Sequence, residues 1–310
     1  MKRSCHIWNK GDILIDGGNS YFKDTRRRSQ ELEAKGFRLL GVGVSGGEEG
    51  ALNGPSLMPG GNETSYKEVE KIFTSIAAQV ADGPCCSYVG DDGAGHYVKM
   101  VHNGIEYGDM QLICEAYYLM KRLLHLSPDG DRGLLPPLES RRAFQLSHGD
   151  LGPHFEPFQT PRPELRWWIR SWERQAARGP GCGRCRTALS LGRPPAHHRA
   201  SRLRQGSFLP RPGACGDVQA GRPLTSLPAP DRDAFAEKIR RALYASKLCS
   251  YAQGFELLHQ ASQHYHWDLD LGGIALLFRG GCIIRAAFLD RLAQAYRACP
   301  TLENLLLSSD

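Results

Sequence analysis

Lys99, Asn103 and Glu106 are the residues of this chain whose types and spacing are best suited to chemistry. In a helix, their spacing of four and then three residues places all three on one face. A lysine and a glutamate seven residues apart lie roughly 10 Å apart along a helix axis. That separation accommodates a few-carbon substrate between an amine and a carboxyl group, so the spacing predicts an acid–base pair. The alternative is an ordinary surface ion pair on a solvated helix.

Strand and helix patterns alternate upstream of these residues. Short apolar runs predict strands at residues 11–16, 37–44 and 86–89, and charged or amphipathic stretches predict helices at residues 24–35 and 66–80. The first strand runs into a Gly-Gly turn that presents Asn19. Such alternation is typical of an α/β layer with a parallel component.

From residue 93 onward the pattern is helical. The apolar residues expected to face inward are Val98, Val101, Ile105 and Leu112 in one helix, and Phe235, Ile239 and Leu243 in another. Asp233 is expected to cap the second of these helices, and a third is expected over residues 283–299, stopping at Pro300. This end of the chain therefore predicts helix-on-helix packing.

The net charge of +6 belongs to one internal segment. Residues 122–232 hold eighteen arginines, no lysine, nine acidic residues and fifteen of the nineteen prolines, whereas the rest of the chain is net negative. Prolines interrupt every candidate helix there, and no aromatic interleaving accompanies the arginines, so we expect no nucleic-acid partner. We interpret the segment as disordered or loosely collapsed. Our hypothesis is that it comes from a shifted reading frame or an alternative exon.

Composition also bears on the cellular compartment of the protein and on its membrane and metal partners. No apolar stretch approaches the roughly eighteen residues of a membrane span, and no signal peptide opens the chain. Ten cysteines in such a chain indicate free thiols, and we expect a cytoplasmic protein without a membrane partner. Cys182 and Cys185 have the spacing of half a zinc site, with a His pair at 197–198, but no matching second pair follows, so no metal is expected.

Four motifs in a fixed order support a family assignment: residues 15–20, 43–50 and 56–61, and the helix of Lys99. Together they closely resemble the 6-phosphogluconate dehydrogenase family, whose enzymes are NADP-dependent and decarboxylating. Residues 233–310 resemble a later helical part of these enzymes, with motifs at 242–247, 250–255 and 279–285. The resemblance covers residues 11–121 and 233–310.

The resemblance implies a fold and an assembly. Residues 11–92 would be the C-terminal part of a Rossmann-like NADP-binding domain, and residues 93–121 and 233–310 would belong to an all-α catalytic domain. Residues 1–10 and 122–232 do not match. The family also implies a homodimer.

The resemblance further implies the reaction, which converts 6-phosphogluconate to ribulose 5-phosphate and CO₂ in the pentose phosphate pathway. Lys99 would remove the proton of the substrate 3-hydroxyl as hydride leaves for NADP, and Glu106 would protonate C1 of the enediol after CO₂ is lost. A lysine base needs a lowered pKa, and the acid must be held protonated. The residues implied to bind substrate are Asn19, Ser45, Gly46, Gly47, His102, Asn103 and Tyr107; Asn19 would also contact the nicotinamide, and Tyr107 would lie near the phosphate.

Family members open with a strand, a Gly-rich turn and a helix that hold the cofactor pyrophosphate, and nothing like this precedes residue 11. We therefore expect impaired NADP affinity. The alternative hypothesis is a catalytically inactive, truncated or frame-shifted derivative that at most dimerises.

Overall fold

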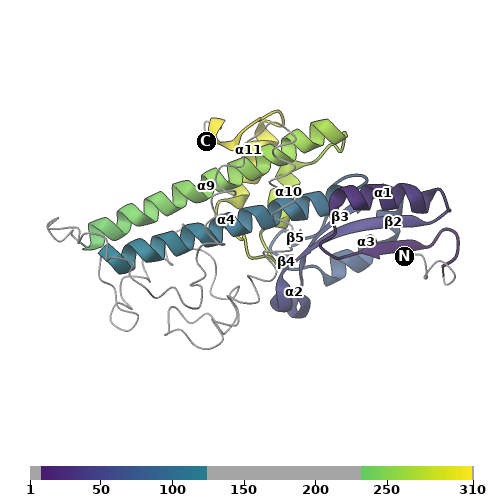
Figure 1. The fold of residues 1–310 in the computed structure, drawn as a ribbon, viewed down its shortest axis with the longest axis horizontal. Coiled ribbons are helices and arrows are strands. Elements are labelled where there is room, and N and C mark those ends of the chain that lie inside the picture. The colour runs from purple at the N-terminus through teal and green to yellow at the C-terminus, as the bar shows by residue number, and fades with distance from the viewer. Residues whose placement is uncertain (1–7, 124–231, 309–310) are drawn as a thin grey trace, which may run out of the picture.

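The computed structural model describes residues 8–123 and 232–308. A small sheet with its helices lies at one end of this part of the molecule, and two long helices extend away from it (Figure 1). Nearly all of the segment predicted to be disordered, residues 122–232, lies outside the described residues, as do Cys182, Cys185 and the His pair at 197–198.

Three strands form the main sheet in the order β1 (Ile13–Asp16), β2 (Arg38–Ser45) and β3 (Ser56–Gly61). β1 pairs with β2 in parallel, and β2 pairs with β3 in antiparallel orientation. The predicted α/β layer with a parallel component is confirmed. β3 was not predicted, because its proline and two glycines are unusual in a strand.

The strand predicted at residues 86–89 is wrong. This stretch meets β3 only at isolated parallel bridges, which join Leu57 to Cys86 and Gly60 to Gly90. Pro59 lies between the two bridges and has no backbone N–H, so a continuous ladder cannot form there. A short two-stranded hairpin, β4 (Gln79–Val80) and β5 (Gly83–Pro84), precedes the stretch.

Three helices connect the strands: α1 (Phe22–Glu33), α2 (Gly47–Asn53) and α3 (Glu63–Ile76). α1 begins two residues before the prediction. α3 begins three residues before it, because Asn62 caps the helix by accepting a hydrogen bond from the Ser65 N–H at 2.9 Å. α3 also ends four residues early, where the chain turns extended at Ala77 and enters β4.

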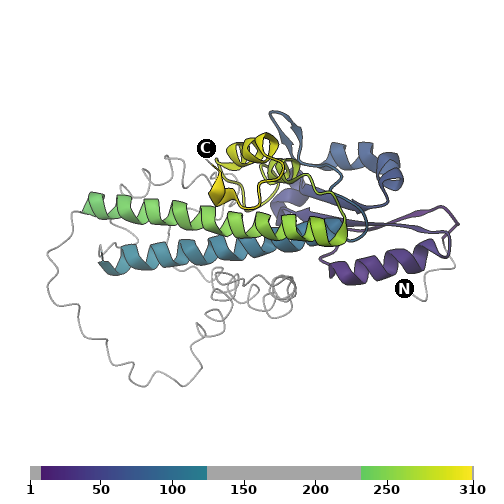
Figure 2. The same cartoon turned by 90° about the horizontal axis from the view of Figure 1, so that it is seen from above.

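Two long helices, α4 (Ala94–Leu123) and α9 (Arg232–Tyr265), lie side by side and run antiparallel (Figures 1 and 2). The predicted inward stripe of α4 is confirmed: Val98, Val101 and Ile105 are fully buried. Leu112 is also buried, but in a separate cluster formed between α4 and α9. α9 includes Asp233, so this residue lies within the helix and is not its N-terminal cap.

The short helices α10 (Leu271–Leu277) and α11 (Leu289–Ala298) and a 3₁₀ turn, η1 (Leu305–Leu307), complete the described fold. The helix predicted from residue 283 begins six residues late. Ile284 is instead fully buried in an irregular segment, where its carbonyl accepts a hydrogen bond from the Tyr251 hydroxyl. Within residues 8–123 and 232–308, no helix is both long enough and apolar enough to cross a membrane.

Candidate active site

Lys99 lies where α4 presses closely on the sheet. A Cβ atom on Gly43 would stand 2.6 Å from the Lys99 Cβ, and one on Gly95 would stand 2.2 Å from the Gly41 carbonyl oxygen. Only glycine permits this approach at either position. The Lys99 side chain consequently lies between helix and sheet, and the residue is only 7% exposed.

His102 is the centre of the predicted site. Its Nε2 lies 3.1 Å from the Ser45 hydroxyl at the end of β2. Its Nδ1 lies 3.3 Å from Lys99 Nζ, 3.1 Å from Asn103 Oδ1 and 3.7 Å from Glu106 Oε2. The imidazole therefore joins the Ser-Gly-Gly loop to all three residues of the predicted helix face. The sequence placed these side chains on one face, and the structure brings them together around one ring.

The hydrogen-bond partners define the protonation of this cluster. The Asn103 carbonyl oxygen can only accept, so His102 Nδ1 carries the proton and the Ser45 hydroxyl donates to Nε2. A neutral Lys99 amine can share the Nδ1 proton, whereas an ammonium group would direct a hydrogen at it. Burial, and then the neighbouring Lys99 charge, hold the pKa of His102 well below its usual range. The contact with Glu106 is therefore not an ion pair.

Burial shifts the pKa values of the two reactive groups in opposite directions. It lowers the pKa of the Lys99 amine, against the opposing influence of Glu106 and Cys282. It raises the pKa of the Glu106 carboxyl group; Lys99 opposes this shift and Asp109 adds to it. Because burial disfavours charge on either group, the site favours a neutral amine beside a protonated acid.

A segment near the C-terminal end of the sequence packs against the predicted Ser-Gly-Gly loop. Gly46 adopts a φ of +129°, and a Cβ there would lie 2.7 Å from Gly50 Cα and 2.8 Å from the Gly281 carbonyl oxygen. The Ser56 N–H donates to that same carbonyl at 3.0 Å. Gly47 follows at the start of α2 with open space where a Cβ would be. The loop can thus offer backbone N–H groups to an anionic ligand. The Gly281 carbonyl, packed against Gly46, supports the loop.

Sequence reasoning gave no site role to Cys282. Its Sγ donates to the Phe278 carbonyl oxygen at 3.1 Å, and burial raises the pKa of the thiol to about 12 despite the nearby Lys99 charge. Cys282 therefore places an uncharged thiol near the Lys99 amine. The signal was the glycine pair that precedes it in the 279–285 motif, since paired glycines often mark a close backbone approach.

Asn19 and Tyr107 are the two remaining residues of the predicted site. Asn19 is exposed in the loop that follows β1. The Asp16 carboxylate accepts hydrogen bonds from the Gly18 N–H at 3.0 Å and the Ser20 hydroxyl at 2.7 Å, so the residues on both sides of Asn19 are held. Tyr107 follows Glu106 on α4 and is half-buried.

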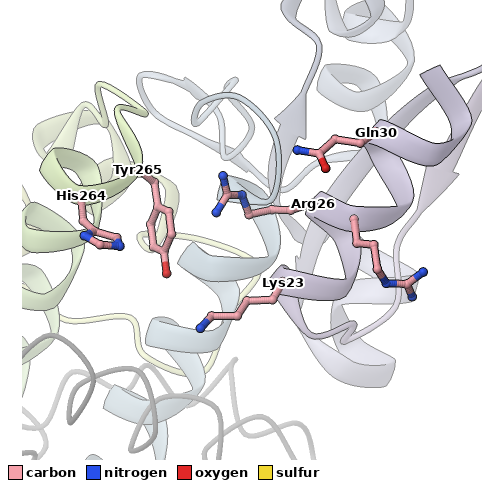
Figure 3. A pocket seen from close by; sticks show the side chains of 6 residues that line it. Lys23, Arg26, Gln30, His264 and Tyr265 are labelled. Atoms are coloured by element: carbon pink, nitrogen blue, oxygen red, sulfur yellow. The ribbon is translucent and has the colours of Figure 1, made fainter. Parts of the chain in front are cut away.

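A separate pocket of about 410 Å³ lies between α1 and the end of α9 (Figure 3). The residues lining it are Lys23, Arg26, Arg27, Gln30, His264 and Tyr265. The Arg26 guanidinium lies 4.8 Å from the centre of the Tyr265 ring and pairs with Asp92, while Arg27 pairs with Glu31. The described surface groups thus already neutralise both arginines, and none of the predicted site residues lines this pocket.

Comparisons with known proteins match both described parts of the chain. The model of the NAD binding domain of 6-phosphogluconate dehydrogenase matches residues 4–90. The model of the 6-phosphogluconate dehydrogenase C-terminal domain matches residues 95–131 and 177–310, which leaves residues 132–176 unmatched.

Individual relatives match over almost the whole chain. The decarboxylating 6-phosphogluconate dehydrogenase of Synechococcus elongatus is 47% identical over 98% of this chain and 65% of its own length. The Escherichia coli K12 enzyme of the same name is 46% identical over 97% of this chain and 64% of its own. A solved Plasmodium falciparum 6-phosphogluconate dehydrogenase superposes with a TM-score of 0.73 at 32% identity, covering 99% of this chain and 66% of that one.

The chain spans about two thirds of the length of the relatives it matches. Both family models fit it, in the order seen in the fold: a Rossmann-like NAD-binding part and then a helical part. This chain belongs to the 6-phosphogluconate dehydrogenase family.

Proposed function

We propose that this chain catalyses the NADP-dependent oxidative decarboxylation of 6-phosphogluconate to ribulose 5-phosphate and CO₂. One observation carries the proposal: a buried amine with a lowered pKa and a carboxyl group with a raised pKa share one helix face around His102. Those are the directions of pKa shift that a lysine base and a carboxylic acid require. The solved Plasmodium falciparum relative, which is described in complexes with NADP⁺ and 6-phosphogluconate, supports the same substrate and cofactor.

In the proposed reaction, the neutral Lys99 Nζ takes the proton of the substrate 3-hydroxyl and becomes an ammonium group. NADP, when bound, supplies the hydride acceptor. The ammonium group then gives its proton to the new C3 carbonyl oxygen as CO₂ leaves, and the bonding electrons form the C=C bond of an enediol. Glu106 delivers its proton to C1 of the enediol, the carbon that has lost the carboxyl group, while Lys99 takes the hydroxyl proton back and the ketone forms. His102 and Asn103 orient the substrate between the two groups, and the Ser45–Gly47 loop holds its carboxylate.

The described residues fit the nicotinamide end of the cofactor. Gly17, Gly18 and Asn19 are exposed in the loop at the carboxyl end of β1, where ligands approach an α/β sheet. The Asp16 carboxylate holds this loop by accepting hydrogen bonds from the Gly18 N–H and the Ser20 hydroxyl. We infer that Asn19 contacts both the nicotinamide and the substrate, and that Tyr107 lies near the substrate phosphate.

We infer further that the chain acts as a homodimer in the cytoplasm, with its cofactor part ending near residue 92. The exposed Tyr118 and Leu119 on the outer part of α4 support association through the long helices. The six free cysteines among the described residues are compatible with a reducing compartment. Sedimentation of the purified chain tests the dimer, and a monomer at micromolar concentration would contradict it.

The test of the reaction is an assay of the full chain with NADP and 6-phosphogluconate, following both NADPH absorbance and released CO₂. Replacing a general base or acid costs about 10²- to 10⁴-fold in rate. We therefore expect Lys99→Met and Glu106→Gln each to lose activity on that scale. Lys67→Met, on the surface of α3, and Glu115→Gln, on α4, are the matched controls and should keep it.

Circular dichroism of each variant separates loss of chemistry from loss of fold. A folded wild-type chain that forms neither NADPH nor CO₂ would overturn the proposal and favour an inactive derivative. Activity that survives Lys99→Met would overturn the assignment of the base.

A further inference from the structure

His96 occupies a buried position that links two parts of the site. It lies in the first turn of α4, three residues before Lys99, and is 2% exposed. Its Nε2 lies 3.0 Å from the backbone carbonyl oxygen of Asp16, and its Nδ1 lies 2.7 Å from the Thr25 hydroxyl on α1. Gly41 makes room for this pair, because a Cβ there would lie 2.7 Å from Thr25 Cγ2 and 3.0 Å from His96 Nδ1.

The partners of His96 allow one arrangement of its protons. A backbone carbonyl can only accept, so Nε2 must donate its proton to Asp16. Burial lowers the pKa of His96, although the neighbouring Asp16 charge opposes that shift. The neutral ring then has a bare Nδ1, and the Thr25 hydroxyl donates to it at 2.7 Å in preference to the Tyr21 carbonyl oxygen at 3.4 Å. Both ring nitrogens are therefore engaged, and the ring is fixed in one tautomer and one orientation.

The carbonyl that His96 holds belongs to the residue that shapes the Asn19 loop. The Asp16 carboxylate accepts from the Gly18 N–H and the Ser20 hydroxyl on either side of Asn19. Asp16 therefore connects His96 to the residues on both sides of Asn19. The hydrogen bond from His96 to Asp16 directly joins this loop to the helix that carries Lys99.

We propose that His96 is a positioning residue that sets the Asn19 loop in register with the Lys99 helix. It touches neither substrate nor cofactor, and acts through Asp16 on one side and through its own helix on the other. The inference rests on the proposed function, in which Asn19 orients the nicotinamide and substrate against the base. Misplacing reacting groups by about 1 Å costs on the order of 10²-fold in rate.

Two amide substitutions separate the two hydrogen bonds of the ring. In His96→Gln the side-chain amide reaches the position of Nε2 and can still donate to Asp16. In His96→Asn it reaches only the position of Nδ1, so the bond to Thr25 can form and the bond to Asp16 cannot. We expect His96→Asn to lose about 10²-fold in kcat/KM, with kcat falling as well as KM rising, and His96→Gln to lose less than about tenfold. His259→Asn, on α9, is the control histidine and should change neither parameter.

Hydrogen exchange of the loop gives a readout that does not require activity. His96→Asn should speed exchange of the amides of residues 17–21, His96→Gln should restore their protection, and residues of α9 should be unchanged in both. If the wild-type chain is inactive but this contrast appears, the proposed function fails and the positioning role stands. Equal kinetics and equal exchange in the two amide variants of an active chain would overturn the positioning role alone. Equal losses in both variants would show a merely structural histidine.

Discussion

The two halves of α4 share one helix but have different surroundings. The inner half, residues 94–109, is packed against β2, β3, α9 and the 279–285 segment, and Val98, Val101 and Ile105 are completely buried. The outer half, residues 110–123, contributes Leu112, Ala116 and Met120 to a smaller cluster with α9, and leaves Tyr118 and Leu119 exposed. Among the charged side chains of α4 whose burial the structure describes, Lys99 and Asp109 in the inner half are buried, whereas Glu115 in the outer half is exposed. The helix therefore sets the spacing of the reactive groups, whereas the packing around its inner half shifts their pKa values.

The largest effect is expected where the two halves meet. Lys247 on α9 lies 3.0 Å from the Asp109 carboxylate, with both side chains less than about a tenth exposed. Lys247→Met leaves this carboxylate facing an apolar side chain, and breaking a buried pair in this way costs about 3–5 kcal/mol. Urea unfolding measures the loss. Adding Asp109→Leu should recover most of it, since an apolar pair needs no charge compensation, and a double variant as unstable as the single one would contradict this explanation.

A pair of large-to-small substitutions compares the halves directly. Ile105→Ala and Leu112→Ala both delete buried side-chain atoms, at a cost of about 2–5 kcal/mol. We expect Ile105→Ala at the upper end, because Ile105 is fully buried in the large core cluster, where a cavity cannot readily collapse. Leu112→Ala should lie at the lower end, because a two-helix contact can close. Urea midpoints at constant m-value measure both, and equal costs would remove the distinction between the halves.

The inner half should also give activity a particular pH dependence. The proposed reaction needs Lys99 unprotonated, so kcat/KM falls about tenfold per unit as the pH drops below the Lys99 pKa. It needs Glu106 protonated, so the rate falls again as the pH rises above the Glu106 pKa. Burial places the first pKa below its ordinary value and the second above its ordinary value. A pH profile of Glu106→Gln should lack the alkaline loss; an unchanged profile would assign that limb to another group.

The smallest effect expected is a gain in stability. Because the pKa of Lys99 is lower in the folded chain than in the unfolded chain, the unfolded chain binds more protons between the two values, and stability rises with pH in that window. At neutral pH the buried amine therefore destabilises the fold. Lys99→Met should raise Tm by roughly 2–4 °C, the shift that about 1 kcal/mol produces in a chain of this size. The gain should shrink as the pH approaches the ordinary lysine range, and a gain independent of pH would point to packing instead.

Much of the inner half followed from local sequence. The face of Lys99, Asn103 and Glu106 and the stripe of Val98 and Ile105 depend only on helical period, which the sequence displays directly. The same reasoning missed β3, since Pro59 and its glycines form a strand only because β2 lies beside them. It also began the last helix too early, because the burial of Ile284 competes with helix formation there.

The sequence could not place the partners that come from far along the chain. Gly281 closes the Ser-Gly-Gly loop and Cys282 lies beside the amine of Lys99, although more than 180 residues separate this thiol from the amine. His102 was predicted only as a substrate ligand, a role that stays a prediction, whereas its contacts make it the junction of the cluster. Such contacts result from tertiary packing, and no spacing within a helix encodes them.

The motifs of the amino-acid sequence indicated the family by resemblance. The sequence by itself also determined the helix that carries the reactive groups and the order in which they lie along one face, because helical period and residue type are local properties. Only the tertiary structure decided the protonation states, because a pKa shift depends on how much water the surrounding elements exclude. Gly43 and Gly95 bring the sheet against α4, and the resulting burial lowers the pKa of the Lys99 amine. The same lysine and glutamate on the exposed outer half of the helix would remain an ordinary charged pair.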